Sequence, residues 1–205
     1  ELAVQVNGKL KGTVTEEAYG QPAGRITVDQ GLAFTDVAAT SPYYDGIEWA
    51  VDEGITNGTT ATTFSPNAPC TRGQIVTFLW RAMGCPAPKS TVNPFTDVKS
   101  GSYCYEAVLW AVEQGITSGV TKTAFAPDRV CTRAQAAVLL WRAEGSPAAS
   151  GTHDFRDVAE GAYYADAVAW AVENGVTTGV GGGRFDPTAT CTRAQIAAFL
   201  ARSMK

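Results

Sequence analysis

The 205-residue sequence predicts an all-α fold built from three tandem helix–loop–helix repeats. The first observation is a segment that recurs three times without gaps, about 60 residues apart, as in repeat architectures. The second is that each copy contains two stretches with apolar side chains at helical spacing. The third is a Thr-Arg-x-Gln motif, typical of a capping box, where each second stretch begins.

The repeats are defined by identical residues at matching positions. Each copy opens with Phe-x-Asp-Val and continues through a Trp, two Gly, a Phe-x-Pro and a Cys-Thr-Arg sequence. The links between copies are rich in Pro, Ala and Ser. We therefore place repeat 1 at residues 34–84, repeat 2 at 95–144 and repeat 3 at 155–205.

Residues 1–33 stand outside the repeats. Leu2, Val4 and Val6 alternate with other residues and precede Asn7-Gly8, a turn signal, so this segment predicts a short β-strand. We expect it to be the tail of an upstream domain or a tether laid against the helices. The sequence begins without Met or a signal peptide, so we expect any export signal to lie outside it.

The first helix of each repeat follows the Asp-Val turn. In repeat 3, Tyr164, Val168 and Ala171 lie at helical spacing. A glycine follows the last periodic residue of each copy, where a left-handed residue ends a helix. We therefore expect first helices at residues 43–53, 103–114 and 163–174.

The second helix of each repeat starts after a Thr and is apolar along most of its length. Such a helix must be covered on most sides, which one hairpin of about 50 residues cannot do. We therefore predict that the three second helices pack as a central bundle around a pseudo-threefold axis. The first helices then lie outside it, in one cooperative spindle-shaped domain.

Composition and charge argue against several functions. The net charge of −4 disfavours nucleic-acid binding, and no apolar run approaches the ~18 residues of a membrane span. His153 is the single histidine and no CxxC spacing exists, so a metal site and histidine-based catalysis are poorly supported. We expect a protein that is not an enzyme and has no cofactor.

An arginine at the first position of each second helix points to anion binding. The helix N-terminus carries partial positive charge, so a cation there costs about a few tenths of a kcal/mol. Free N–H groups, the helix dipole and a guanidinium together make a carboxylate or phosphate site. The alternative is that each arginine pairs with the Asp of the Phe-x-Asp-Val turn, and both hold if that Asp orients the arginine. The motif arginines are Arg72, Arg133 and Arg193, and the turn aspartates are Asp36, Asp97 and Asp157.

Three further sets recur and are candidate ligand contacts. The capping glutamines, Gln74, Gln135 and Gln195, are expected to cap first and contact ligand second. The loop glycines, Gly58, Gly119 and Gly179, are positive-φ turn residues or places where a ligand approaches the backbone. The helix tryptophans, Trp49, Trp110 and Trp170, either pack in the core or form a platform on which sugars stack. The arginines of the last turn, Arg81, Arg142 and Arg202, are interpreted as structural.

The five cysteines fall into two groups. Three occupy equivalent positions before the cap and are expected to be small buried apolar residues: Cys70, Cys131 and Cys191. Cys85 and Cys104 do not repeat and flank the linker between repeats 1 and 2. A disulfide between Cys85 and Cys104 is one option for that pair.

The repeated motifs resemble S-layer homology (SLH) domains. The residues that carry this resemblance are Phe-x-Asp-Val, the segment 163–175, Phe-x-Pro and Thr-Arg-Ala-Gln, over residues 34–205. The resemblance implies three repeats in a pseudo-threefold spindle that anchors an exported bacterial protein non-covalently to the cell wall. It also implies an extracellular location in the cell wall or S-layer. The implied ligand is a secondary cell wall polymer with pyruvylated N-acetylmannosamine, held in grooves between repeats, where the motif arginines meet its negative charge.

This sequence departs from the family pattern in three ways. The usual motif Glu is Gln here, which keeps the cap and removes a negative charge beside the anion site. A Cys stands where the family usually has an apolar residue before the Thr. Gly73 replaces the usual Ala, which weakens that helix start and makes one groove unequal to the others.

The expected function is therefore a wall-anchoring module that binds an anionic glycopolymer. Two alternatives stay open. One is binding of peptidoglycan or its modified stem peptides. The other is lateral self-association into an S-layer lattice.

Overall fold

A computed structural model describes residues 2–6, 9–14, 31–149, 151 and 153–204. Six helices lie in these ranges, two in each predicted repeat, which confirms the all-α repeat fold. They are α1 (Tyr44–Asp52), α2 (Arg72–Ala82), α3 (Tyr105–Glu113), α4 (Arg133–Ala143), α5 (Ala165–Glu173) and α6 (Arg193–Met204). The bounds of α1, α3 and α5 lie within one or two residues of those expected, and α2, α4 and α6 begin directly after the expected Thr.

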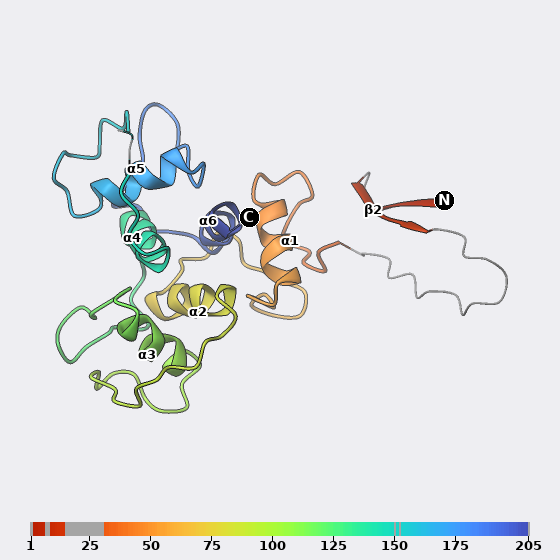
Figure 1. The fold of residues 1–205 in the computed structure, drawn as a ribbon. Coiled ribbons are helices and arrows are strands. Elements are labelled where there is room, and N and C mark those ends of the chain that lie inside the picture. Colours follow the sequence, from red (N-terminus) through yellow and green to blue (C-terminus); the bar gives the residue numbers. More distant parts are fainter. Residues whose placement is uncertain (1, 7–8, 15–30, 150, 152, 205) are drawn as a thin grey trace.

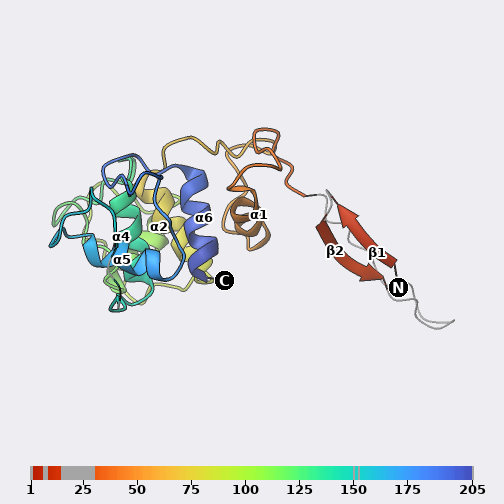
Figure 2. The same cartoon turned by 90° about the horizontal axis from the view of Figure 1, so that it is seen from above.

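The segment before the repeats forms a β-hairpin. Strand β1 (Leu2–Val6) pairs antiparallel with β2 (Lys9–Val14), with Leu2 opposite Val14 and a register shift after Val4. This confirms the strand predicted from Leu2, Val4 and Val6, whereas its partner strand β2 was not predicted. The Asn7-Gly8 turn signal lies outside the described residues. Both views place the hairpin apart from the helices (Figures 1 and 2).

The three second helices, α2, α4 and α6, form the centre of the helical part, as predicted, and the first helices lie outside (Figure 1). The packing partners cross between repeats. Helix α3 packs on α2 and α5 packs on α4, so each of these outer helices covers the second helix of the preceding repeat. Helix α1 packs on α6 and closes the ring. No repeat therefore buries its own helices alone.

Three cysteines join the repeats at the pseudo-threefold axis. The N–H of Cys70 donates to Cys191 O at 2.9 Å, that of Cys131 to Cys70 O at 3.0 Å, and that of Cys191 to Cys131 O at 2.9 Å. All three side chains are fully buried, as predicted. Burial raises the pKa of Cys70 to about 12 and that of Cys131 to about 11, so both are neutral thiols at pH 7.

The other two cysteines do not pair. Cys85 is an exposed free thiol and Cys104 is a buried free thiol at the N-cap position of α3, so the disulfide considered for them is absent from this structure. The Cys104 sulfur lies 3.9 Å from the hydroxyl of Ser102. Within the described ranges, no helix combines the length and the apolar character needed to cross a bilayer.

Candidate functional site

Each motif arginine begins a central helix, as predicted, and its side chain crosses to the adjacent repeat. The Nε atom donates to the main-chain carbonyl of a loop phenylalanine. The three pairs are Arg72 with Phe125 O at 2.8 Å, Arg133 with Phe185 O at 2.8 Å, and Arg193 with Phe64 O at 2.9 Å. The arginines are only 6%, 3% and 4% exposed, so they are less open than an anion site on the surface would be.

The same phenylalanine also lies under the guanidinium. The distance from the guanidinium carbon to the ring centroid is 4.7 Å for Arg72 and 4.8 Å for Arg133 and Arg193. Arg193 has a second ring, Phe78, at 5.5 Å, and Arg133 has Phe199 at 5.6 Å. Two aromatic faces favour a desolvated cation at these positions.

The repeats differ in what the terminal nitrogens contact. Arg72 Nη2 donates to Thr117 Oγ1 at 3.4 Å. Within the described part of the chain, Arg72 has no second aromatic ring, because the residue of repeat 2 that corresponds to Phe78 and Phe199 is Leu139. The Nη2 atoms of Arg133 and Arg193 are buried and have no hydrogen-bond partner among the described residues. A buried unpaired donor on a cation is costly, so an acceptor brought within reach of either atom would stabilise the protein.

The turn aspartates do not pair with the motif arginines. Asp97 instead accepts from the N–H of Phe125 at 2.9 Å and of Ala126 at 2.7 Å, and the other two repeats have the same arrangement. The prediction of a direct ion pair between motif arginine and turn aspartate is therefore wrong for the described residues. Burial acts to raise the pKa of Asp97, but the two N–H donors outweigh it and lower the pKa.

The aspartates orient the arginines indirectly. The loop phenylalanine gives its N–H to the turn aspartate of its own repeat and its carbonyl to the motif arginine of a neighbour. The aspartate therefore fixes the peptide that positions the guanidinium. The turn aspartate thus orients the motif arginine through the peptide groups of the loop phenylalanine and not through a direct ion pair.

The capping glutamines and loop glycines have the predicted structural roles. In each central helix, the N-cap Thr and the Gln three residues later form both bonds of the capping box. Gly58 has a φ of +84°, and a Cβ there would lie 2.5 Å from the Phe34 ring, so only glycine fits. Gly119 and Gly179 have the same conformation and the same close ring.

The helix tryptophans pack in the core, as the first of their two interpretations predicts. Trp110 and Trp170 are buried, and Trp49 is partly buried against the core. Trp170 borders a separate hollow with Glu144 and Arg202. None of the three lies at the pocket beside Arg193, so the role of sugar platform has no support there.

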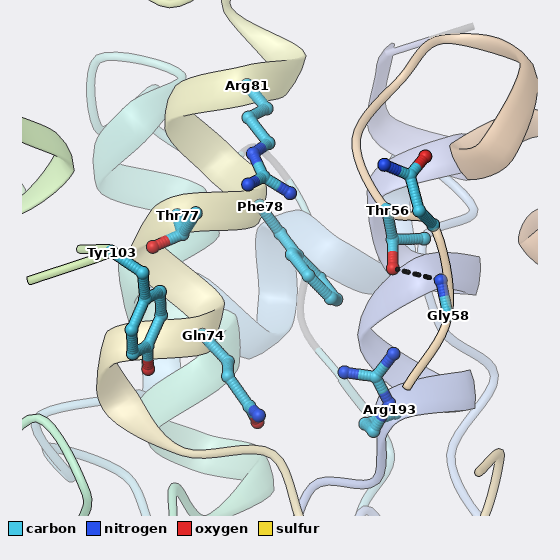
Figure 3. A pocket seen from close by; sticks show the side chains of 9 residues that line it. Thr56, Gly58, Gln74, Thr77, Phe78, Arg81, Tyr103 and Arg193 are labelled. Carbon is cyan, nitrogen blue, oxygen red and sulfur yellow. Dashed lines mark hydrogen bonds between the residues drawn. The ribbon is translucent and has the colours of Figure 1, made fainter. Parts of the chain in front are cut away.

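A pocket of about 300 Å³ opens beside Arg193 (Figure 3). All three repeats contribute to it, because Arg193 comes from repeat 3 and Tyr103 from repeat 2. The lining residues are Thr56, Asn57, Gly58, Gln74, Thr77, Phe78, Arg81, Tyr103 and Arg193. Two are cationic and none is acidic, so the pocket favours an anion. Hereafter we call it the 3–1 groove.

Sequence reasoning missed six of the nine lining residues of the 3–1 groove, among them Arg81, Phe78 and Tyr103. Arg81 donates to Ile55 O at 2.9 Å, so its structural role is real, but it also lines the groove opposite Arg193. Phe78 is one of several apolar residues of α2, and nothing in the sequence singles it out as a groove residue. Tyr103 comes from another repeat, and only its recurrence as Tyr163 could have drawn attention to it.

Three segments of the chain match the S-layer homology domain, at residues 33–76, 94–137 and 154–197. The chain belongs to the S-layer homology domain family. Each SLH match ends within a central helix, just after the capping glutamine. The three tandem SLH repeats are thus confirmed.

Curated relatives include proteins of bacterial surfaces. The chain is 30% identical over its whole length to a surface-layer 125 kDa protein of Lysinibacillus sphaericus, covering 18% of it. It is 28% identical to the S-layer protein sap of Bacillus anthracis, over 96% of the chain and 24% of that protein. An endoglucanase of Bacillus sp. (strain KSM-635) is 36% identical over 56% of the chain and 12% of the enzyme.

The chain therefore spans less than a quarter of the length of these relatives. SLH membership makes it a cell-surface module associated with the cell wall. In the part of the chain that the structure describes, no cluster of three or more His, Cys, Asp or Glu side chains is arranged to hold a metal ion.

Proposed function

We propose that this SLH module anchors an exported surface protein by binding an anionic, pyruvylated cell wall polysaccharide in the 3–1 groove. The observation that carries the proposal is that Arg193, whose buried Nη2 has no hydrogen-bond partner among the described residues, lines a pocket with Arg81 and no acid. A ligand carboxylate would lie between the guanidinium groups of Arg193 and Arg81.

The expected strength of one groove is modest. A hydrogen bond to a charged group is worth about 1.5–3 kcal/mol, so two such bonds alone correspond to dissociation constants from about 6 mM to about 40 μM. Firm attachment then requires a polymer that carries many copies of the ligand unit, because linked sites raise the effective concentration.

Sedimentation with purified cell walls tests the proposal. Arg193→Lys keeps the charge but loses the planar fork, and Arg81→Gln removes the second cation, so each is expected to lower wall binding at least about fivefold. Arg156→Gln, an exposed arginine outside the groove, is the matched control. Thermal melts confirm that each variant is folded. Wild-type binding by both groove variants would contradict the proposal.

Acid extraction of the secondary polymer identifies the ligand. The proposal expects binding to disappear from extracted walls. Binding that persists would instead indicate peptidoglycan or its stem peptides as the ligand.

The relatives named S-layer proteins favour lateral self-association as a second candidate function. It predicts concentration-dependent light scattering by the purified chain without walls. A constant monomer mass over the same range would exclude it.

A further inference from the structure

The 3–1 groove differs from its two counterparts at one close contact. Gly73 is the second residue of α2, and the matching residues of the other repeats are Ala134 and Ala194. A Cβ built on Gly73 would lie 2.7 Å from the hydroxyl oxygen of Tyr103. Real Cβ atoms do not approach so closely, so the glycine makes room for the tyrosine.

The contact fixes one end of the Tyr103 ring. Its hydroxyl lies against the start of α2, where burial raises the pKa of Tyr103 and the Thr71 side chain opposes this shift. The residue is still 57% exposed and lines the 3–1 groove beside Gln74 (Figure 3). Tyr103 is therefore an exposed aromatic side chain whose hydroxyl packs against Gly73 at the start of α2.

The matching positions lack this arrangement. Tyr163 is 65% exposed and packs edge-on against Tyr164, with ring centroids 5.0 Å apart. The residue of α4 that corresponds to Gly73 is Ala134, so repeat 3 has no glycine at the matching position for its tyrosine. The third position is Pro42, which has no aromatic ring. Among these three positions, only Tyr103 in the 3–1 groove is an aromatic residue packed against a glycine of the neighbouring helix.

We propose that Tyr103, seated by Gly73, makes the 3–1 groove select a sugar ring attached to the carboxylate over a bare carboxylate. This inference rests on the proposed function. The guanidinium groups of Arg193 and Arg81 recognise charge, which a small carboxylate also supplies. The tyrosine adds an apolar face of fixed position, on which the C–H face of a pyranose packs. A pocket of about 300 Å³ is at the small end of ligand sites, which suits one sugar unit.

Calorimetry with two probes tests the inference. The probes are a synthetic pyruvylated N-acetylmannosamine and pyruvate alone. Gly73→Ala displaces the Tyr103 hydroxyl and Tyr103→Ala removes the ring. Each is expected to weaken binding of the sugar about tenfold and to leave the weaker pyruvate binding unchanged. Ala134→Gly, at the matching position in α4, is the control and should bind as wild type does.

The possible results distinguish the role of Tyr103 from the proposed binding of a pyruvylated polysaccharide. If Arg193→Lys lowers sugar binding while Gly73→Ala and Tyr103→Ala both bind as wild type does, the role of Tyr103 is wrong and the proposed function stands. If the wild-type chain does not bind the pyruvylated sugar, both are wrong. Because alanine favours helix more than glycine does, Gly73→Ala is not expected to unfold α2, and a thermal melt checks this.

Discussion

At the residue scale, the loop phenylalanine connects the repeats. Phe125 donates its N–H to Asp97, accepts from Arg72 Nε at its carbonyl and places its ring under the same guanidinium. The next residue, Ala126, has a φ of +58°, which is unfavourable for a residue other than glycine. The second carboxylate oxygen of Asp97 accepts from Ala126 N–H and stabilises this conformation.

These contacts predict how stability depends on pH. The pKa values of Asp97 and Asp157 are lowered in the folded protein, so the unfolded chain binds more protons near pH 4. The stabilisation is fully present above the unfolded pKa and is lost as the pH falls through the folded values. Urea midpoints should be equal at pH 7 and pH 5 and lower at pH 3. Asp97→Asn should reduce the decline, and an unchanged midpoint at pH 3 would count against this role.

A loop glycine gives a second prediction at this scale. At Gly119, φ is +86° and a Cβ would lie 2.5 Å from the Phe95 ring. Gly119→Ala should therefore lower the free energy of unfolding by about 2–4 kcal/mol. Gly115 has a φ of +71° but open space around it, so Gly115→Ala should cost only about 1 kcal/mol. Equal losses in the two variants, measured by urea unfolding, would show that the ring contact is unimportant.

The sequence could not predict where the motif arginines point. Their position at the helix start follows from the Thr and Gln of the cap. The direction of the Arg72 side chain depends on Phe125, which lies in another repeat. The contact of Gly73 with Tyr103 was missed for the same reason, because no local pattern records an approach between repeats.

At the element scale, local signals position the helices accurately. The central helices start at the residue after the cap Thr, and the outer helices end just before a glycine with positive φ, Gly54 in repeat 1. These signals are local because a cap satisfies N–H groups within one turn of itself. Helix boundaries were therefore predictable, while the choice of packing partner was not.

The capping box of α4 makes a quantitative prediction. Thr132 Oγ1 accepts from Gln135 N–H at 3.3 Å and Gln135 Oε1 accepts from Thr132 N–H at 3.1 Å. Thr132→Ala should lower the free energy of unfolding by about 1 kcal/mol. Since the two bonds form one unit, adding Gln135→Ala should cost less than it does alone. Strictly additive losses in a double-mutant cycle would contradict this coupling.

At the scale of the whole molecule, the repeats exchange their covering helices. Helix α1 covers α6, although the two lie at opposite ends of the repeat region. The sequence predicted a cooperative domain and a central bundle, since one hairpin buries too little surface. It did not predict this exchange, because covering α2 with either α1 or α3 satisfies the same apolar pattern.

Truncation tests the exchange. Residues 31–149 contain two complete repeats but lack α6, so α1 loses the helix on which it packs, and Phe64 loses Arg193. This fragment should lack a cooperative thermal transition, whereas an open solenoid would keep most of its stability after losing an end repeat. Circular dichroism melts of the fragment and the full chain distinguish the two. A sharp transition in the fragment would favour the open arrangement.

In the ring of main-chain hydrogen bonds among Cys70, Cys131 and Cys191, each cysteine donates one bond and accepts one, so the three repeats are equivalent there. A single repeat carries one copy of each surface in that ring, so three separate chains of one repeat have the complementarity of a closed trimer. The linkers then act by keeping the partners at high effective concentration. In a single chain, one repeat can also change its sequence while the other two keep theirs. Gly73 is an example, because the matching residues of the other repeats are both alanine.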